Sequence, residues 1–382
     1  MKVVWLCLVA TVGLVAVPAR ADLGDDIAAC EPLEFSSCVA LQKAAASRKP
    51  EIALLAKKLA ATETPAAVIA KLALALALLD GREHTDALQA AAQRLAGKPE
   101  VADVRAAQAR LGDPRATPVL LELAKPGNAP HAQLLAVGSL GLLRAHEALP
   151  VLLQLVVDDA QPQVQAEAAR ALASIADKAA APVLLAVAGR PEAFVPARAE
   201  ALHALARVGS TAAASLAVLL ADHPSAALAR AALDVLGAVW QPWMTPAVVA
   251  AAAMPGLRAE AARLAGAQGV AEVTPLLVQA VVSGSAQPDE IAALLEAIGV
   301  LKPTGVAAAL VGRLSQAGKA EKILILHALP KLGDRTVVPD LVVFLQDADN
   351  QIVSNTVYAL ENITGRNLGP DVAAWRKFAG LP

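Results

Sequence analysis

The pattern of apolar and polar residues repeats along most of the chain with a period of 32 residues. Three nearly identical phrases, PVLLEL, PVLLQL and PVLLAV, begin at Pro118, Pro150 and Pro182. Equivalent phrases lie before and after them, with one shorter step of 29 residues, and open at Asp86, Pro118, Pro150, Pro182, Ala214, Pro246, Pro275, Ala307 and Pro339. Within a unit, apolar residues recur at spacings of three, four and seven, which places them on one buried face of a helix.

Each unit predicts two helices joined by a short turn. Apolar residues before the opening position, such as Leu140 and Leu143, indicate a first helix, helix A. The opening proline indicates the first turn of a second helix, helix B, because its missing N–H would have no partner there in any case. Gly112–Asp113 and Gly333–Asp334 supply the turn between the two. One pair cannot bury its apolar face alone, so we expect an all-α solenoid of about nine or ten stacked helical hairpins.

The segments Val104–Ala107, Leu111–Asp113 and Pro118–Leu121 resemble the HEAT repeat, and in particular the short HEAT-like repeats of phycobilisome-lyase-related proteins. The residues from Ala328 to Leu341 resemble it again. The resemblance covers roughly residues 66–365. It implies a right-handed α-solenoid whose B helices line the concave face and present that face to a protein partner.

The start of the chain is typical of a secretory signal peptide. Lys2 precedes the apolar stretch Val3–Val17, and the small-x-small sequence Ala19-Arg20-Ala21 follows it. We therefore expect residues 1–21 to be removed by cleavage after Ala21, and the mature chain to be periplasmic or secreted.

The two ends of the mature chain depart from the 32-residue register. Residues 22–65 predict an N-terminal helical cap, and Cys30 and Cys38 within it predict a structural disulfide, because an exported chain meets an oxidising compartment. Residues 66–365 predict the repeat array, and residues 366–382 a C-terminal capping helix in which Trp375 and Phe378 cover the last repeat.

The composition excludes several classes of protein. The chain is 56% hydrophobic, 2% aromatic and 18% charged, which disfavours β-sheet and disorder, and its net charge of −2 gives no basic surface for nucleic acid. The uncharged stretch Val235–Leu257 is long enough to cross a membrane, but Pro242, Pro246 and Pro255 interrupt it. We expect no membrane span in the mature chain.

No catalytic, cofactor-binding or metal-binding residue is predicted. None of the six histidines pairs with another at helical spacing, and neither G-x-S-x-G nor a phosphate-binding glycine loop occurs. The HEAT-like enzyme deoxyhypusine hydroxylase binds two irons through several His–Glu pairs, whereas His146-Glu147 is the one such pair here. We expect a non-enzymatic scaffold for protein–protein interaction without cofactors. A bilin-lyase-type enzyme, a metal-dependent hydroxylase and a carrier of an apolar ligand are the alternatives.

The predicted binding surface is an apolar patch on the concave helix-B face. Tryptophan and methionine are favoured at binding surfaces, but apolar residues at helical spacing are also usual in cores, and both interpretations are open here. The candidate residues are Ala186, Val218, Trp240, Trp243, Met244, Ala250 and Met254.

Overall fold

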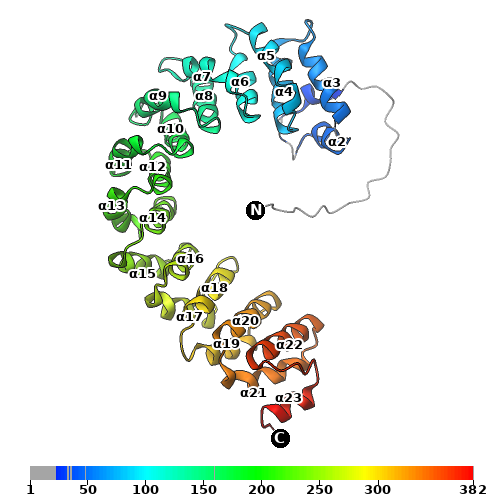
Figure 1. Ribbon diagram of the computed structural model, residues 1–382, viewed down its shortest axis with the longest axis vertical. Coiled ribbons are helices and arrows are strands. Elements are labelled where there is room, and N and C mark those ends of the chain that lie inside the picture. Colours follow the sequence, from blue (N-terminus) through cyan, green and yellow to red (C-terminus); the bar gives the residue numbers. More distant parts are fainter. Residues whose placement is uncertain (1–22, 32–33, 35–36, 48, 159, 382) are drawn as a thin grey trace. The chain divides into compact units, whose positions relative to one another are not determined.

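The computed structural model describes residues 23–31, 34, 37–47, 49–158 and 160–381, and all of its regular structure is helical (Figure 1). The predicted signal peptide therefore lies outside the described residues. The chain divides into two compact units, with the boundary between Leu143 and Arg144. The all-α class and the solenoid arrangement of successive helix pairs agree with the prediction.

The first unit consists of an N-terminal group of three helices followed by repeated helix pairs. The disulfide between Cys30 and Cys38 joins the end of the first helix to the start of the second, with their Cα atoms 5.7 Å apart. The helices are α1 (Leu23–Ala29), α2 (Val39–Ser47), α3 (Lys49–Ala60), α4 (Ala66–Leu78), α5 (Thr85–Arg94), α6 (Val101–Arg110), α7 (Thr117–Ala124) and α8 (Pro130–Leu142), with 3-10 turns at Arg82–His84 and Pro114–Ala116.

The second unit continues the same alternation to the C-terminus. Its helices are α9 (Leu149–Leu155), α10 (Pro162–Ile175), α11 (Ala181–Ala188), α12 (Val195–Val208), α13 (Ala214–Leu220), α14 (Ala226–Ala238), α15 (Thr245–Ala253), α16 (Arg258–Gln268), α17 (Thr274–Val282), α18 (Ile291–Leu301), α19 (Val306–Leu314), α20 (Lys319–Leu332), α21 (Val338–Leu341), α22 (Asn350–Thr364) and α23 (Val372–Phe378). The 3-10 turns are His146–Ala148, Lys178–Ala180, Thr211–Ala213, Pro242–Met244, Ala271–Val273, Arg335–Val337 and Val342–Gln346.

The turn inside each helix pair follows from the sequence. The side chain of Asp113 accepts a hydrogen bond from the backbone N–H of Arg115, and Asp177 and Asp334 do the same for the residue two positions on. A 3-10 turn follows, and the opening proline then lies in the first turn of helix B. The single short step of 29 residues coincides with α16, which has 11 residues where α12 has 14.

Successive pairs are joined by a buried polar contact that also recurs. The side chain of Gln133 donates to the carbonyl of Ala124 at 3.0 Å, and that of Gln165 donates to the carbonyl of Val156 at 3.1 Å. Arg198 donates to the carbonyl of Ala188 at 3.0 Å. In each case, the first turns of a helix A satisfy a carbonyl at the end of the preceding helix B, which would otherwise be buried without a partner.

The two sets of helices lie on opposite sides of the second unit. The alanine-rich A helices α10, α12 and α14 pack directly on one another, whereas the B helices α11, α13 and α15 contact each other much less (Figure 1). The A helices thus lie closer together than the B helices. The unit therefore bends toward its A helices, and the prediction that helix B lines the concave face is wrong.

The last helix, α23, packs against the 3-10 turn Val342–Gln346. Trp375 is fully buried, and its indole N–H donates to the carbonyl of Gly369 at 2.8 Å. Phe378 lies edge-on to it, with ring centroids 5.8 Å apart. No helix in the described part of the chain combines the length and apolar character that a membrane crossing needs.

Candidate interaction surface

A polar surface runs over the A helices of the second unit. Each of these helices is covered on two sides by its neighbours and behind by the B helices, so its exposed strip faces the inner side of the bend. We call these strips, from α10 to α22, the inner surface. One polar or charged residue of each successive helix from α10 to α20 lies on it, namely Arg170, His203, Asp234, Arg263, Glu296 and His327.

Contacts between neighbouring helices neutralise most of the charges on α10 to α16. Arg170 donates to one carboxylate oxygen of Glu200 from Nη2 at 2.7 Å and from Nε at 3.1 Å, and it also pairs with Glu167. Arg230 lies 3.1 Å from Glu260. Arginine–glutamate pairs thus link α10 to α12 and α14 to α16, as largely exposed pairs that each stabilise the fold only modestly.

A hollow of about 530 Å³ lies within the inner surface, between α10, α12 and α14. The imidazole Nδ1 of His203 lies 2.9 Å from a carboxylate oxygen of Asp234 inside it. That hydrogen bond raises the pKa of His203, and partial burial opposes the rise. The lining residues are Arg170, Ala173, Ser174, Glu200, His203, Ala206, Arg207 and Asp234.

The presence of serine, histidine and aspartate in one hollow does not form a nucleophilic triad. The hydroxyl of Ser174 donates to the carbonyl of Arg170 at 3.2 Å, one turn back in its own helix, and makes no hydrogen bond to His203. A serine nucleophile requires a hydrogen bond to its base and donors for the developing oxyanion. These three side chains therefore do not have the hydrogen-bonded arrangement of such a triad.

The tryptophan–methionine cluster that the sequence suggested is divided between core and surface. Met244 is 1% exposed and lies in the core, so its assignment to a binding surface is wrong. Trp243 beside it is 53% exposed, and Trp240 and Met254 are half-buried. Helical spacing alone could not separate neighbouring residues of one 3-10 turn, because consecutive side chains there point in different directions.

The three predicted helix-B positions lie away from the inner surface. Ala186 on α11 is exposed, and Val218 on α13 and Ala250 on α15 are half-buried. All three belong to the outer helices, so they do not form a concave apolar patch. The structure places polar and charged side chains on the inner side instead.

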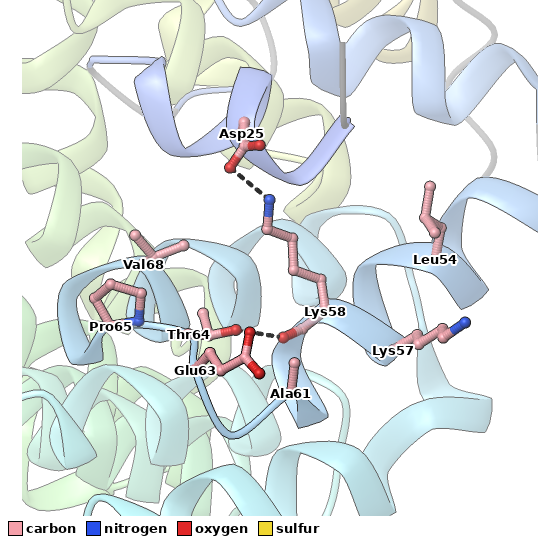
Figure 2. A pocket seen from close by; sticks show the side chains of 9 residues that line it. All are labelled: Asp25, Leu54, Lys57, Lys58, Ala61, Glu63, Thr64, Pro65 and Val68. Atoms are coloured by element: carbon pink, nitrogen blue, oxygen red, sulfur yellow. Dashed lines mark hydrogen bonds and ion pairs between the residues drawn. The ribbon is translucent and has the colours of Figure 1, made fainter. Parts of the chain in front are cut away.

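Two further hollows lie outside the inner surface. One, of about 540 Å³, is bounded by α1, α3 and the turn before α4; there Lys58 pairs with Asp25, and Thr64 donates to the carbonyl of Lys58 at 2.8 Å (Figure 2). The other, of about 560 Å³, lies between α17 and α19 and has an uncharged, mostly apolar lining that includes Pro275 and Val278. Within the residues that the structure describes, no three His, Cys, Asp or Glu side chains come together in a group that could hold a metal ion.

Comparison with known proteins defines the class of this helix stack. The family model for HEAT repeats matches residues 117–196 and 149–237. Residues 117–237 are therefore similar to HEAT repeats, and the fold of the chain is that of an α-solenoid. No curated protein matches the sequence.

Solved structures share this fold at low sequence identity. The chain is similar to Kap95p in a complex with RanGDP, at a TM-score of 0.56 and 12% identity over 92% of this chain and 56% of that one. It is also similar to Kap95 in its complex with Nup1, at a TM-score of 0.54 and 12% identity over 92% and 57% of the two chains. The chain thus spans a little over half the length of these proteins.

The phycocyanin lyase CpcE–CpcF from Nostoc is 20% identical over 74% of this chain and 94% of that one. Its TM-score is 0.35, and the likeness carries no argument about activity.

Proposed function

We propose that the chain is an exported, non-enzymatic scaffold that binds a protein partner along the inner surface of its second unit. The observation that carries the proposal is the continuous exposed strip of polar side chains over consecutive A helices, with an open hollow at α12. Solenoids of this kind present long surfaces, and each helix adds one more contact position. The complexes of Kap95 with RanGDP and Nup1 support a role in protein binding for the fold, although fold alone does not define function.

The test is capture of the partner from an envelope fraction by wild-type protein and by two variants. Arg207 and Arg263 are exposed and make no ion pair or hydrogen bond with any described residue, so charge reversal to Glu at both leaves the fold intact. We expect this double variant to lose the partner. Lys178→Glu in the turn before α11, equally exposed and unpaired among the described residues, should retain it. Equal capture by all three proteins would contradict binding on the inner surface.

The enzymatic alternative predicts stoichiometric metal or turnover. Elemental analysis of the purified protein for iron and zinc tests the hydroxylase version, because a scaffold contains neither in stoichiometric amount. A bound ion at one or more equivalents per chain would exclude the non-enzymatic scaffold.

A second candidate function is suggested by the hollow between α17 and α19. Its lining contains no charged residue, and Thr274 in the lining has a buried hydroxyl oxygen without a hydrogen-bond partner among the described residues. An apolar small molecule would suit such a site. Native mass spectrometry, with organic extraction of the purified protein, would show whether a ligand is bound, and Val278→Asp should remove it.

A further inference from the structure

The inner surface changes in character at its C-terminal end. Over α10 to α16 most of its charges pair with one another, Arg207 and Arg263 excepted, whereas over α18 to α22 it presents an aromatic ring, an apolar side chain and a free ammonium group. These belong to Tyr358 on α22, Val300 on α18 and Lys331 on α20. Tyr358 is the single tyrosine of the chain, in a sequence with 2% aromatic residues.

The ring of Tyr358 is held in place without being buried. It is 45% exposed, and its centroid lies 5.2 Å from that of His327 on the neighbouring helix. His327 is fixed in turn by a hydrogen bond of 2.6 Å to Asn355, whose side-chain amide donates to the carbonyl of Gln351 at 2.7 Å. The phenol oxygen makes no hydrogen bond to any described residue. An exposed ring that is already ordered loses little entropy when a partner covers it, and tyrosine is favoured at binding hot spots.

Lys331 differs from the two other lysines of α20. Lys319 pairs with Asp349 at 2.6 Å and Lys322 with Asp347 at 3.1 Å, so both charges are neutralised by the segment that leads into α22. Lys331 is exposed and has no ion pair or hydrogen bond among the described residues.

The Lys331 side chain crosses from α20 to α18. A Cβ atom placed on Gly299 would come within 2.7 Å of Lys331 Cδ, so the absence of a side chain at Gly299 is what lets the lysine stem lie there. Val300, the next residue, is 54% exposed. His327 and Lys331 are four residues apart on one helix face, so the ring of Tyr358, the ammonium group and Val300 form one continuous patch.

We propose that this patch binds an extended segment of the partner protein in which a large apolar side chain and a single carboxylate lie within four residues of each other. The apolar side chain covers the Tyr358 ring and the carboxylate pairs with Lys331.

The charge next to the patch limits the partner to one acidic residue. Glu296, one turn before Val300 on α18, is exposed and makes no ion pair among the described residues. It faces the same inner surface and disfavours a second carboxylate on that side. A polyacidic tract is therefore not the partner that this surface fits.

The inference rests on the proposed function, because it concerns the partner of the same surface. The probe is a fluorescein-labelled decapeptide of Gly, Ser and Thr that carries one Phe and one Asp, made with the two residues either two or four positions apart, and binding to the full chain is measured by fluorescence anisotropy. We expect binding to weaken at least five-fold when Asp is replaced by Asn and at least ten-fold when Phe is replaced by Ser.

Protein variants assign the contacts. Lys331→Gln should lower the affinity for the Asp peptide at least five-fold and leave the affinity for the Asn peptide unchanged. Lys319→Gln, on the same helix, should change neither affinity by more than two-fold. Tyr358→Ala should lower the affinity for both peptides. Tyr358→Phe keeps the ring and removes only the hydroxyl, so it should bind both peptides as the wild-type protein does. Melting temperatures of all variants control for folding.

Equal affinity for the Asp and Asn peptides, no effect of Lys331→Gln, or no binding of the probe by wild-type protein would overturn this inference. The proposed function would then still stand if the Arg207→Glu, Arg263→Glu variant loses the captured partner. If that variant also keeps the partner, both proposals are wrong.

Discussion

His203 and Asp234 are 31 residues apart in the chain and belong to consecutive repeats, yet the imidazole Nδ1 lies 2.9 Å from the carboxylate. This contact links α12 to α14 on the inner surface, and it makes the stability of the array depend on pH. Its neighbourhood contains Arg170 and Arg207 as cations and Glu167 and Glu200 as acids, so His203 titrates within a nearly balanced set of charges.

The His203–Asp234 pair should make the protein more stable at mildly acidic than at alkaline pH. Asp234 raises the pKa of His203 in the folded protein above its unfolded value of about 6.5. The stabilisation is therefore fully present below about pH 6.5 and is lost as the pH rises through the folded pKa. The free energy of unfolding, measured with urea, should be lower at pH 8.5 than at pH 6 in the wild-type protein. This difference should be smaller in Asp234→Asn. An equal loss in both proteins would show that another group is responsible.

Met244 and Trp243 should respond oppositely to truncation, although they are adjacent. Met244→Ala removes a buried side chain and should lower the free energy of unfolding by about 2–5 kcal/mol. Trp243→Ala removes a side chain that is 53% exposed and should change it by about 0.5 kcal/mol or less. Chemical denaturation of the two variants measures both values. A large loss for Trp243→Ala would instead place the indole in the core.

The buried carboxylate of Glu290 should be a weak point of the array. It lies 3.4 Å from Arg258, and it also accepts backbone hydrogen bonds from Gly256 and Gln287 at 3.0 and 2.9 Å. Glu290→Ala leaves the Arg258 charge buried beside two unpaired N–H groups, which should cost about 3–5 kcal/mol. Arg313→Ala, which breaks the more exposed Arg313–Glu321 pair, is the matched control and should cost less. Equal losses in urea unfolding would contradict this ranking.

Removal of the disulfide should loosen the N-terminal helices and leave distant repeats unaffected. The two cysteines are eight residues apart in the sequence. Closing a loop of that size in the unfolded chain lowers its entropy and stabilises the folded protein by about 2–3 kcal/mol. Hydrogen exchange of a Cys30→Ser, Cys38→Ser variant should accelerate over α1–α3 and remain unchanged over α12–α16, because repeats couple chiefly to their neighbours. Uniform acceleration along the chain would show long-range coupling instead.

The helix pairs and their boundaries could be predicted because they depend on local chemistry. Proline in the first turn, an aspartate cap five residues earlier and a 32-residue apolar register determine where α7, α11 and α21 begin, whatever lies around them. The position of the Cys30–Cys38 disulfide followed in the same way from two cysteines close together in the chain.

The side on which the surface lies could not be obtained from that register. Which helices face the inner side of the bend depends on how closely each set packs, and alanine content does not give it, because α11 and α15 are at least as rich in alanine as α10 and α12. The His203–Asp234 contact was missed because a step of 32 residues from His203 leads to Val235, whereas the facing residue lies one position earlier. Tyr358 gave no periodic signal at all, since its exposure depends on the neighbouring helix.

The recurrent hydrogen bond from the start of one helix A to the end of the preceding helix B makes the contacts between successive repeats equivalent. Gln165 and Arg198 perform the same task one repeat apart, each reaching a carbonyl about nine or ten residues earlier. Deletion of residues 165–197 would bring Arg198 to the place of Gln165, with a donor still available for the carbonyl of Val156. The array can thus gain or lose a whole repeat without forming a new kind of interface. Gene duplication would lengthen such a chain in this way, and deletion of one repeat would shorten it.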